Sequence, residues 1–199
     1  MKKYEEIIDF INKKNSVITT KDFKGKKIGF YFINKLIQDN YIYRIEKGVY
    51  GKKDSFEDEY FIIQNRYKNA IFSYNTALYF FNKTEVTPNI IDISIPNDYN
   101  VSTINTKRIR VHYVSRENMD LGSIRIKSPF GNTIKSYNLE RTICDIVKNE
   151  RKSGLDIEQR NKIIRKAFSN NDIDGSILIQ YAKKLKCEKK IRVIMEVLT

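Results

Sequence analysis

The stretch KGKKIGFYFINKLIQDNYIYRIEKGVYGK, residues 24–52, decides how the N-terminal part of the chain is interpreted. A run of lysines leads into apolar residues at helical spacing, and two short segments rich in β-branched and aromatic residues follow. Gly48 stands between these two segments, where a tight hairpin needs a residue that accepts positive φ. The stretch therefore predicts a helix over residues 27–39, followed by a hairpin that turns at residues 46–48. The apolar spacing predicts that this helix buries Ile28, Phe32, Leu36 and Ile37.

The residues before this stretch predict two further helices. Apolar side chains at helical spacing predict an amphipathic helix over residues 3–14. A short extended segment follows at residues 17–18, and Thr19 or Thr20 is placed to cap a short helix that Gly25 closes. Helix, short strand, helix, helix, hairpin is the element order of a winged helix-turn-helix. In that fold the third helix enters a DNA groove and the hairpin forms the wing.

The charge of the chain favours an anionic partner. The 199 residues include 37 Lys and Arg against 24 Asp and Glu, a formal net charge of +13. Residues 1–53 hold 13 basic and 6 acidic residues, so the excess is densest at the N-terminal end. Such an excess is typical of nucleic-acid-binding modules, although a solvated basic surface gives the same count. We expect double-stranded DNA to be the partner.

Candidate DNA contacts lie just before the third helix, on its outer face and in the hairpin. Lysine and arginine bind phosphates, whereas asparagine and tyrosine can contact bases. The alternative is the solvated polar face of an ordinary surface helix. The predicted DNA-binding residues are Lys24, Lys26, Lys27, Tyr31, Asn34, Lys35, Arg44 and Lys47.

A polar segment after residue 52 predicts a boundary between a winged-helix domain, residues 1–53, and a second domain, residues 54–199. The second domain reads as α+β, a small mixed sheet with C-terminal helices. The expected helices lie near residues 60–67, 75–81, 138–150, 156–169, 173–186 and 188–198, and the expected strands near 90–95, 108–114 and on both sides of the turn at 128–132.

Few residues of the chain are typical of catalysis. His112 is the only histidine, and in an alternating strand it is expected to be a structural, hydrogen-bonded residue. Cys144 and Cys187 lack metal-ligand spacing, and no phosphate-binding glycine motif is present. We therefore expect no enzyme activity, no catalytic residues, no metal ligands and no cofactor. The alternative is a nuclease with a basic docking domain, in which Asp92 and Asp98 would be the first acids to test.

The segment SYNLERTICDIV, residues 136–147, predicts a helix that Asn138 caps. Arg141 and Asp145 are four residues apart, in the less favourable order for the helix dipole. The simplest interpretation is an exposed ion pair worth about 0.3 kcal/mol.

Two motifs give the chain a likeness to a known family. Arg44, Gly48 and Tyr50 form an Arg-x3-Gly-x-Tyr pattern in the hairpin, and Glu140, Arg141, Thr142 and Asp145 form a Glu-Arg-Thr-x-x-Asp pattern. With these motifs the chain resembles, over nearly its whole length, the AbiEi antitoxins of bacterial abortive-infection (phage defence) systems.

The resemblance implies two activities. The N-terminal domain would repress transcription of its own operon by binding inverted repeats in the promoter. The C-terminal domain, which carries the second motif as its antitoxin-domain motif, would counteract a nucleotidyltransferase-like AbiEii toxin. The type IV toxin–antitoxin class to which that family belongs does not require a stable complex between the two proteins.

Two further expectations concern location and an alternative partner. Acidic residues within the first apolar run argue against a signal peptide, and no apolar run approaches the length of a membrane span, so a cytoplasmic location without membrane contact is expected. A third function remains open, in which the basic domain binds an acidic toxin directly instead of DNA.

Overall fold

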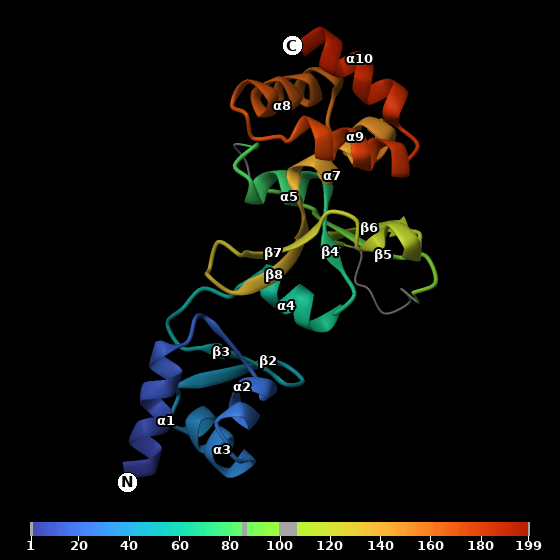
Figure 1. Ribbon diagram of the computed structural model, residues 1–199. Helices are drawn as coiled ribbons and strands as arrows, with labels where there is room; N and C mark the ends of the chain where they lie inside the picture. Colours follow the sequence, from blue (N-terminus) through green and yellow to red (C-terminus); the bar gives the residue numbers. More distant parts are fainter. Residues whose placement is uncertain (1, 85–86, 100–106, 199) are drawn as a thin grey trace. The chain divides into compact units, whose positions relative to one another are not determined.

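A computed structural model describes residues 2–84, 87–99 and 107–198, and it has an α+β fold (Figure 1). The chain divides into two compact units. The first unit comprises residues 1–67 and 127–134, and the second comprises residues 68–126 and 135–199. The predicted boundary between residues 53 and 54 therefore lies inside the first unit.

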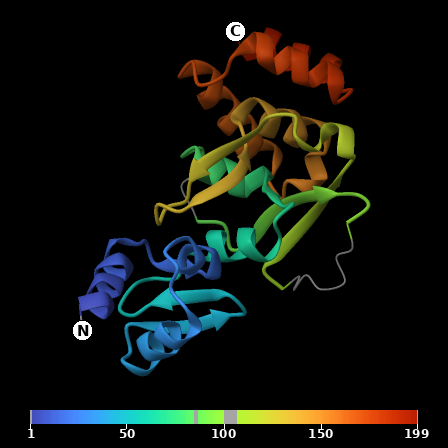
Figure 2. The ribbon, with the colours of Figure 1, turned by 60° about the horizontal axis from the view of Figure 1, so that its bottom comes forward.

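The first unit contains helices gathered around a small antiparallel sheet (Figure 2). The strand order is β1-β3-β2, and β3 pairs with both neighbours in antiparallel register. The elements are α1 (Lys2–Lys13), β1 (Val17–Thr19), α2 (Thr20–Gly25), α3 (Phe30–Gln38), β2 (Ile42–Glu46), β3 (Val49–Lys52) and α4 (Glu59–Arg66).

The core of the first unit explains why it extends beyond the predicted boundary. Ile18, Phe23 and Leu36 are fully buried in a cluster to which α1, α2, α3 and the sheet all contribute. A second cluster joins Ile62 of α4 to Val17 of β1 and Val49 of β3. Helix α4 thus covers apolar surface of the small sheet, and the unit continues through it.

The turn between α2 and α3 differs from the prediction. The third helix begins at Phe30, not at residue 27, because Lys27 adopts a left-handed conformation with φ of 54°. The amide of Ile28 donates to the carbonyl of Phe23 at 2.9 Å, which closes α2 with a bond typical of helix C-termini. Gly25 is the last residue of α2, but the left-handed residue is a lysine two positions later.

The β2–β3 hairpin forms as predicted, with Gly48 at φ of 79°. The backbone amide of Thr20 donates to the carbonyl of Gly48 at 2.9 Å, and the Thr20 hydroxyl donates to the same oxygen at 3.1 Å. A Cβ atom at residue 48 would lie 2.9 Å from Oγ1 of Thr20. The hairpin tip is therefore fixed against the start of α2, and glycine is required there for both space and conformation.

A buried carboxylate holds residues 127–134 in the first unit. Asp58 is fully buried and caps α4 by accepting from the amide of Phe61 at 3.0 Å. Its other oxygen accepts from the hydroxyl of Ser128 at 2.5 Å and from Nδ2 of Asn132 at 2.7 Å. Three donors thus replace water around a charge that is costly to bury.

The second unit holds most of a five-stranded mixed sheet with order β6-β5-β4-β8-β7, and only the last residue of β7 and the first two residues of β8 are counted in the first unit. Strand β5 runs antiparallel to β4 and parallel to β6, and β4 runs parallel to β8. The strands are β4 (Ile71–Phe72), β5 (Ile91–Pro96), β6 (Ile109–Val114), β7 (Ser123–Lys127) and β8 (Thr133–Tyr137).

Helices of the second unit share one apolar cluster, which includes Leu78, Ile143, Ile164, Leu178 and Ile191. Figure 1 shows α8, α9 and α10 gathered near α7. The predicted C-terminal helices form, whereas the short α6 and η1 were not predicted. The bounds are α5 (Tyr74–Phe80), α6 (Arg116–Met119), α7 (Leu139–Lys148), the 3-10 helix η1 (Glu150–Lys152), α8 (Ile157–Ser169), α9 (Gly175–Lys184) and α10 (Glu188–Leu198).

Candidate nucleic-acid interface

Helix α3 presents an open aromatic and amide face. Its inner side buries Ile33 and Leu36, whereas Phe30 and Tyr31 are 69% and 71% exposed. The spacing of Phe30, Asn34 and Gln38, four residues apart, places them on one face, and all three are exposed. The sequence predicted Tyr31 and Asn34, but not Phe30 and Gln38, as candidate contacts on this face. The predicted buried stripe included Phe32, whereas the structure buries Ile33. Phe32 is only half-buried.

Three predicted lysines precede the start of α3. Lys24 and Lys26 lie at the end of α2, and Lys27 occupies the left-handed position of the turn. All three are exposed. The ammonium of Lys26 lies 5.9 Å from the ring centroid of Phe10. Within residues 2–84, 87–99 and 107–198, none of the three lysines pairs with a carboxylate, so their charges are available to an anion.

Lys35 differs from the other predicted contacts because it packs against α1. Its side chain is half-buried, and the ammonium lies 4.4 Å from the ring centroid of Tyr4. The hydroxyl of Tyr4 in turn donates to a carboxylate oxygen of Asp39 at 2.6 Å. Burial and the bond to Asp39 together raise the pKa of Tyr4. Lys35 thus stabilises the α1–α3 contact and is not part of the exposed lysine group.

The hairpin carries the remaining two predicted cations. Arg44 on β2 and Lys47 at the turn are both exposed. Glu46, between them in sequence, pairs with Arg66 of α4 and accepts from its Nε at 2.8 Å. Glu46 is the one acidic residue of the hairpin, and it pairs with an arginine outside the hairpin. It therefore does not neutralise the charges of Arg44 and Lys47.

Arg141 and Asp145 in the second unit are buried, so the predicted exposed ion pair is wrong. They are 1% and 6% exposed, and Nε of Arg141 donates to Oδ2 of Asp145 at 3.0 Å. One terminal nitrogen of Arg141 donates to the carbonyls of Asn118 at 2.6 Å and Leu121 at 2.8 Å. The guanidinium lies 4.1 Å from the ring centroid of Tyr137. Burial raises the pKa of Asp145, and the charge of Arg141 opposes that rise.

The other members of the Glu-Arg-Thr-x-x-Asp motif also make internal bonds. Asn138 caps α7 as predicted, since its side chain accepts from the amide of Arg141 at 3.1 Å. The hydroxyl of Thr142 donates to the carbonyl of Asn138 at 2.8 Å, and Glu140 accepts from the amide of Asp174 at 3.0 Å. The motif therefore fastens α7 to the loops around it.

Asp92 and Asp98, the acids of the nuclease alternative, have different surroundings. Asp92 is buried, and Nε2 of His112 lies 2.7 Å from Oδ1 of Asp92. The ring of His112 stacks on the ring of Tyr74, with 3.9 Å between the two ring centroids. His112 is therefore buried and hydrogen-bonded, as predicted. Asp98 is exposed and accepts from Nε of Arg116 at 2.5 Å.

Cys144 and Cys187 are buried free thiols. Over the residues that the structure describes, no three His, Cys, Asp or Glu side chains group in a way that could hold a metal ion. In the same residues, every helix is too short or too polar to cross a membrane.

Comparison with known proteins identifies a related fold. No protein-family model matches the chain, and no curated protein matches it. The crystal structure of the RV2827C protein from Mycobacterium tuberculosis is similar, with a TM-score of 0.52 and 12% sequence identity. The match covers 92% of this chain and 75% of that chain. At this identity the likeness shows a shared fold alone.

Proposed function

We propose that the first unit is a winged-helix module that binds double-stranded DNA, with α3 as the recognition helix and the β2–β3 hairpin as the wing. The observation that carries the proposal is the exposed face of α3 that carries Tyr31 and Asn34, which directly follows in sequence three exposed lysines that pair with no carboxylate among the described residues. Lys24 and Lys27 would bind phosphates, and Asn34 would read a base edge. Arg44 and Lys47 would add phosphate or minor-groove contacts.

The biological role that we propose is that of an autoregulatory transcriptional repressor and antitoxin in a phage-defence operon. Its support is the likeness of the hairpin and α7 motifs to AbiEi antitoxins. The partners would be the protein's own promoter and an AbiEii-type toxin, without a requirement for a stable complex. Two copies of the protein would bind an inverted repeat, one on each half-site.

The test measures binding of the full chain to its own promoter fragment by fluorescence anisotropy over a range of salt concentrations. The logarithm of the affinity should fall linearly with the logarithm of salt concentration, with a slope of about −0.9 for each phosphate contacted. The double variant Lys24→Glu, Lys27→Glu should bind at least about tenfold more weakly, and its slope should be shallower by about 2.

The matched control is Lys183→Glu, Lys184→Glu, which changes the net charge by the same amount at exposed positions of α9 in the second unit. It should leave the slope unchanged. DNA binding through α3 would be contradicted by a promoter affinity that does not change with salt concentration. Equal losses of promoter affinity in the two double variants would contradict it as well.

A further inference from the structure

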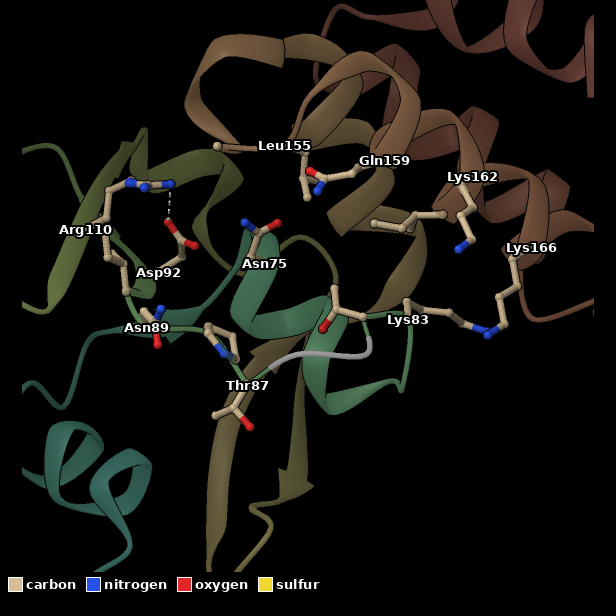
Figure 3. Close-up of a pocket in the computed structure, with 15 residues that line it drawn as sticks. Asn75, Lys83, Thr87, Asn89, Asp92, Arg110, Leu155, Gln159, Lys162 and Lys166 are labelled. Carbon is tan, nitrogen blue, oxygen red and sulfur yellow. Dashed lines mark ion pairs between the residues drawn. The ribbon is translucent and has the colours of Figure 1, made fainter.

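The second unit contains a pocket of about 620 Å³ that the proposed DNA contacts do not use (Figure 3). Its volume is within the range of small-molecule sites. One wall comes from β5, β6 and α5, and another from α8 and the loop before it. The side chains that carry the argument are Asn75, Asp92, Arg110, Leu155, Lys162 and Lys166.

Two buried acceptor oxygens at one end of the pocket make no hydrogen bond with the described residues, although Arg110 lines the same end. Asp92 is 1% exposed. Its Oδ1 lies 2.7 Å from Nε2 of His112 and 3.5 Å from a terminal nitrogen of Arg110. Its Oδ2 is buried and makes no hydrogen bond with the described residues, and the same holds for Oδ1 of Asn75. A buried acceptor without a hydrogen bond lowers the stability of the fold, and a bound donor would remove that cost. This end of the pocket therefore suits a ligand that donates N–H or O–H groups.

This end is held in place before any ligand binds. Nδ2 of Asn75 donates to the carbonyl of Ser153 at 2.8 Å, which orients its Oδ1. Arg110 donates to the carbonyls of Lys152 and Ser153 at 3.4 and 3.5 Å while it pairs with Asp92. A Cβ atom at Gly154 would lie 2.9 Å from a terminal nitrogen of Arg110. The loop at residues 152–154 thus fixes the positions of the Asn75 and Arg110 side chains.

The opposite wall is cationic. Gln159, Lys162, Ile163 and Lys166 recur at intervals of three or four residues on α8 and line the pocket together. Lys162 and Lys166 are exposed and pair with no carboxylate among the described residues, whereas Lys83 nearby pairs with Asp172. Two unpaired ammonium groups on one helix face suit a phosphate chain.

We propose that this pocket binds a nucleotide, with the base at Asp92 and Asn75 and the phosphates at Lys162 and Lys166. Leu155 and Ile163 supply apolar surface for the flat body of the base. Guanine matches the two acceptors best, because its ring N–H and amino group are adjacent donors on one edge. All lining residues belong to the second unit, so nucleotide binding can be tested without DNA.

The experiment is calorimetry of the full chain with guanosine triphosphate, adenosine triphosphate and inorganic tripolyphosphate. Guanosine triphosphate should bind at least about tenfold more tightly than either of the others, which is about 1.4 kcal/mol. Asp92→Asn preserves size but replaces an acceptor by a donor, so it should abolish the preference for guanine. Lys162→Glu, Lys166→Glu should weaken binding about tenfold or more.

Lys183→Glu, Lys184→Glu is again the control with matched charge and should bind as the wild type does. Thermal unfolding of each variant establishes that the fold is retained. The proposal is overturned if tripolyphosphate binds as tightly as the nucleotides, if neither nucleotide binds at millimolar concentration, or if the Lys162, Lys166 variant binds normally. A folded Asp92→Asn variant with an unchanged preference would also overturn it.

Discussion

Nε of Arg141 donates to Oδ2 of Asp145 at 3.0 Å inside the second unit, where both side chains are almost fully shielded from water. Removing one partner leaves the other charge buried and unpaired. We therefore expect Arg141→Met to lower the free energy of unfolding by about 3–5 kcal/mol. Urea denaturation monitored by circular dichroism measures the change.

The double variant Arg141→Met, Asp145→Leu is the informative comparison. It removes both charges and fills similar volume, so it should be less destabilised than Arg141→Met alone. The carbonyls of Asn118 and Leu121 lose their donor in both variants, so part of the loss remains. A double variant that is less stable than the single one would show that an unpaired Asp145 charge is not what destabilises Arg141→Met.

The hairpin tip offers a test of backbone conformation. Gly48→Ala should destabilise the protein by at least about 1–2 kcal/mol, because a left-handed residue with a side chain is strained and its Cβ would press on Thr20. Gly25→Ala is the control, since a Cβ atom there meets nothing within 4 Å. The melting temperatures of the two variants should differ clearly, and equal values would argue against the fixed tip.

Asp22 gives a pH-dependent contribution to stability. Burial alone would raise its pKa, but bonds from Lys14 and Thr19 outweigh burial and hold the pKa below its ordinary value of 3.8. A lowered folded-state pKa contributes stability that is present above pH 3.8 and is lost as pH falls through the folded value. The stability advantage of the wild type over Asp22→Asn should therefore shrink during acid titration.

Urea midpoints measured between neutral pH and about pH 2 should follow this trend. Asp9→Asn, at an exposed position of α1, controls for the loss of one negative charge. An advantage over Asp22→Asn that stays constant down to the lowest pH would contradict the assigned bonds.

Asp58 and Asp156 provide a matched pair of helix caps. Both accept from amides at the start of a helix, at 3.0 Å in α4 and 2.7 Å in α8, but Asp156 is exposed. Asp156→Ala should cost about 1 kcal/mol, the usual value of a cap. Asp58→Ala should lower the free energy of unfolding by about 2–4 kcal/mol, because Ser128 and Asn132 also lose the carboxylate to which they donate. Equal losses would mean that these donors find other partners.

The face of α3 allows base reading to be separated from phosphate binding. Asn34→Ala should reduce discrimination between promoter and random DNA by about 1–3 kcal/mol while the salt slope stays unchanged. Asn12→Ala, exposed on α1, should change neither quantity. Competition anisotropy with both DNAs gives the two quantities. A shallower slope in the Asn34 variant would assign it to the phosphate contacts instead.

Local patterns predicted the elements that depend on neighbours in sequence. Helical spacing gave the helix at residues 3–14, and Gly48 marked the hairpin. The start of α3 was misplaced because the left-handed residue is Lys27, whereas the pattern pointed to Gly25. Lysine has no special tendency toward positive φ, so nothing local marks that turn.

Features built from distant residues were missed for a physical reason. The burial of Arg141 depends on carbonyls about twenty positions earlier, and that of Asp58 on donors about seventy positions later. The candidate nucleotide pocket likewise unites Asp92 with a face of α8. No spacing rule connects such positions, so the sequence could suggest candidate DNA contacts, which are local, but gave no indication of the pocket.

The inclusion of residues 127–134 in the first unit has an evolutionary consequence. A segment of residues 1–67 alone would keep the Asp58 carboxylate but lose Ser128 and Asn132, and the stranded charge would have to regain water. Gene recombination that exchanged only residues 1–67 would thus leave the first unit without part of its buried interior. We therefore expect the two units to be inherited together and not exchanged separately between proteins.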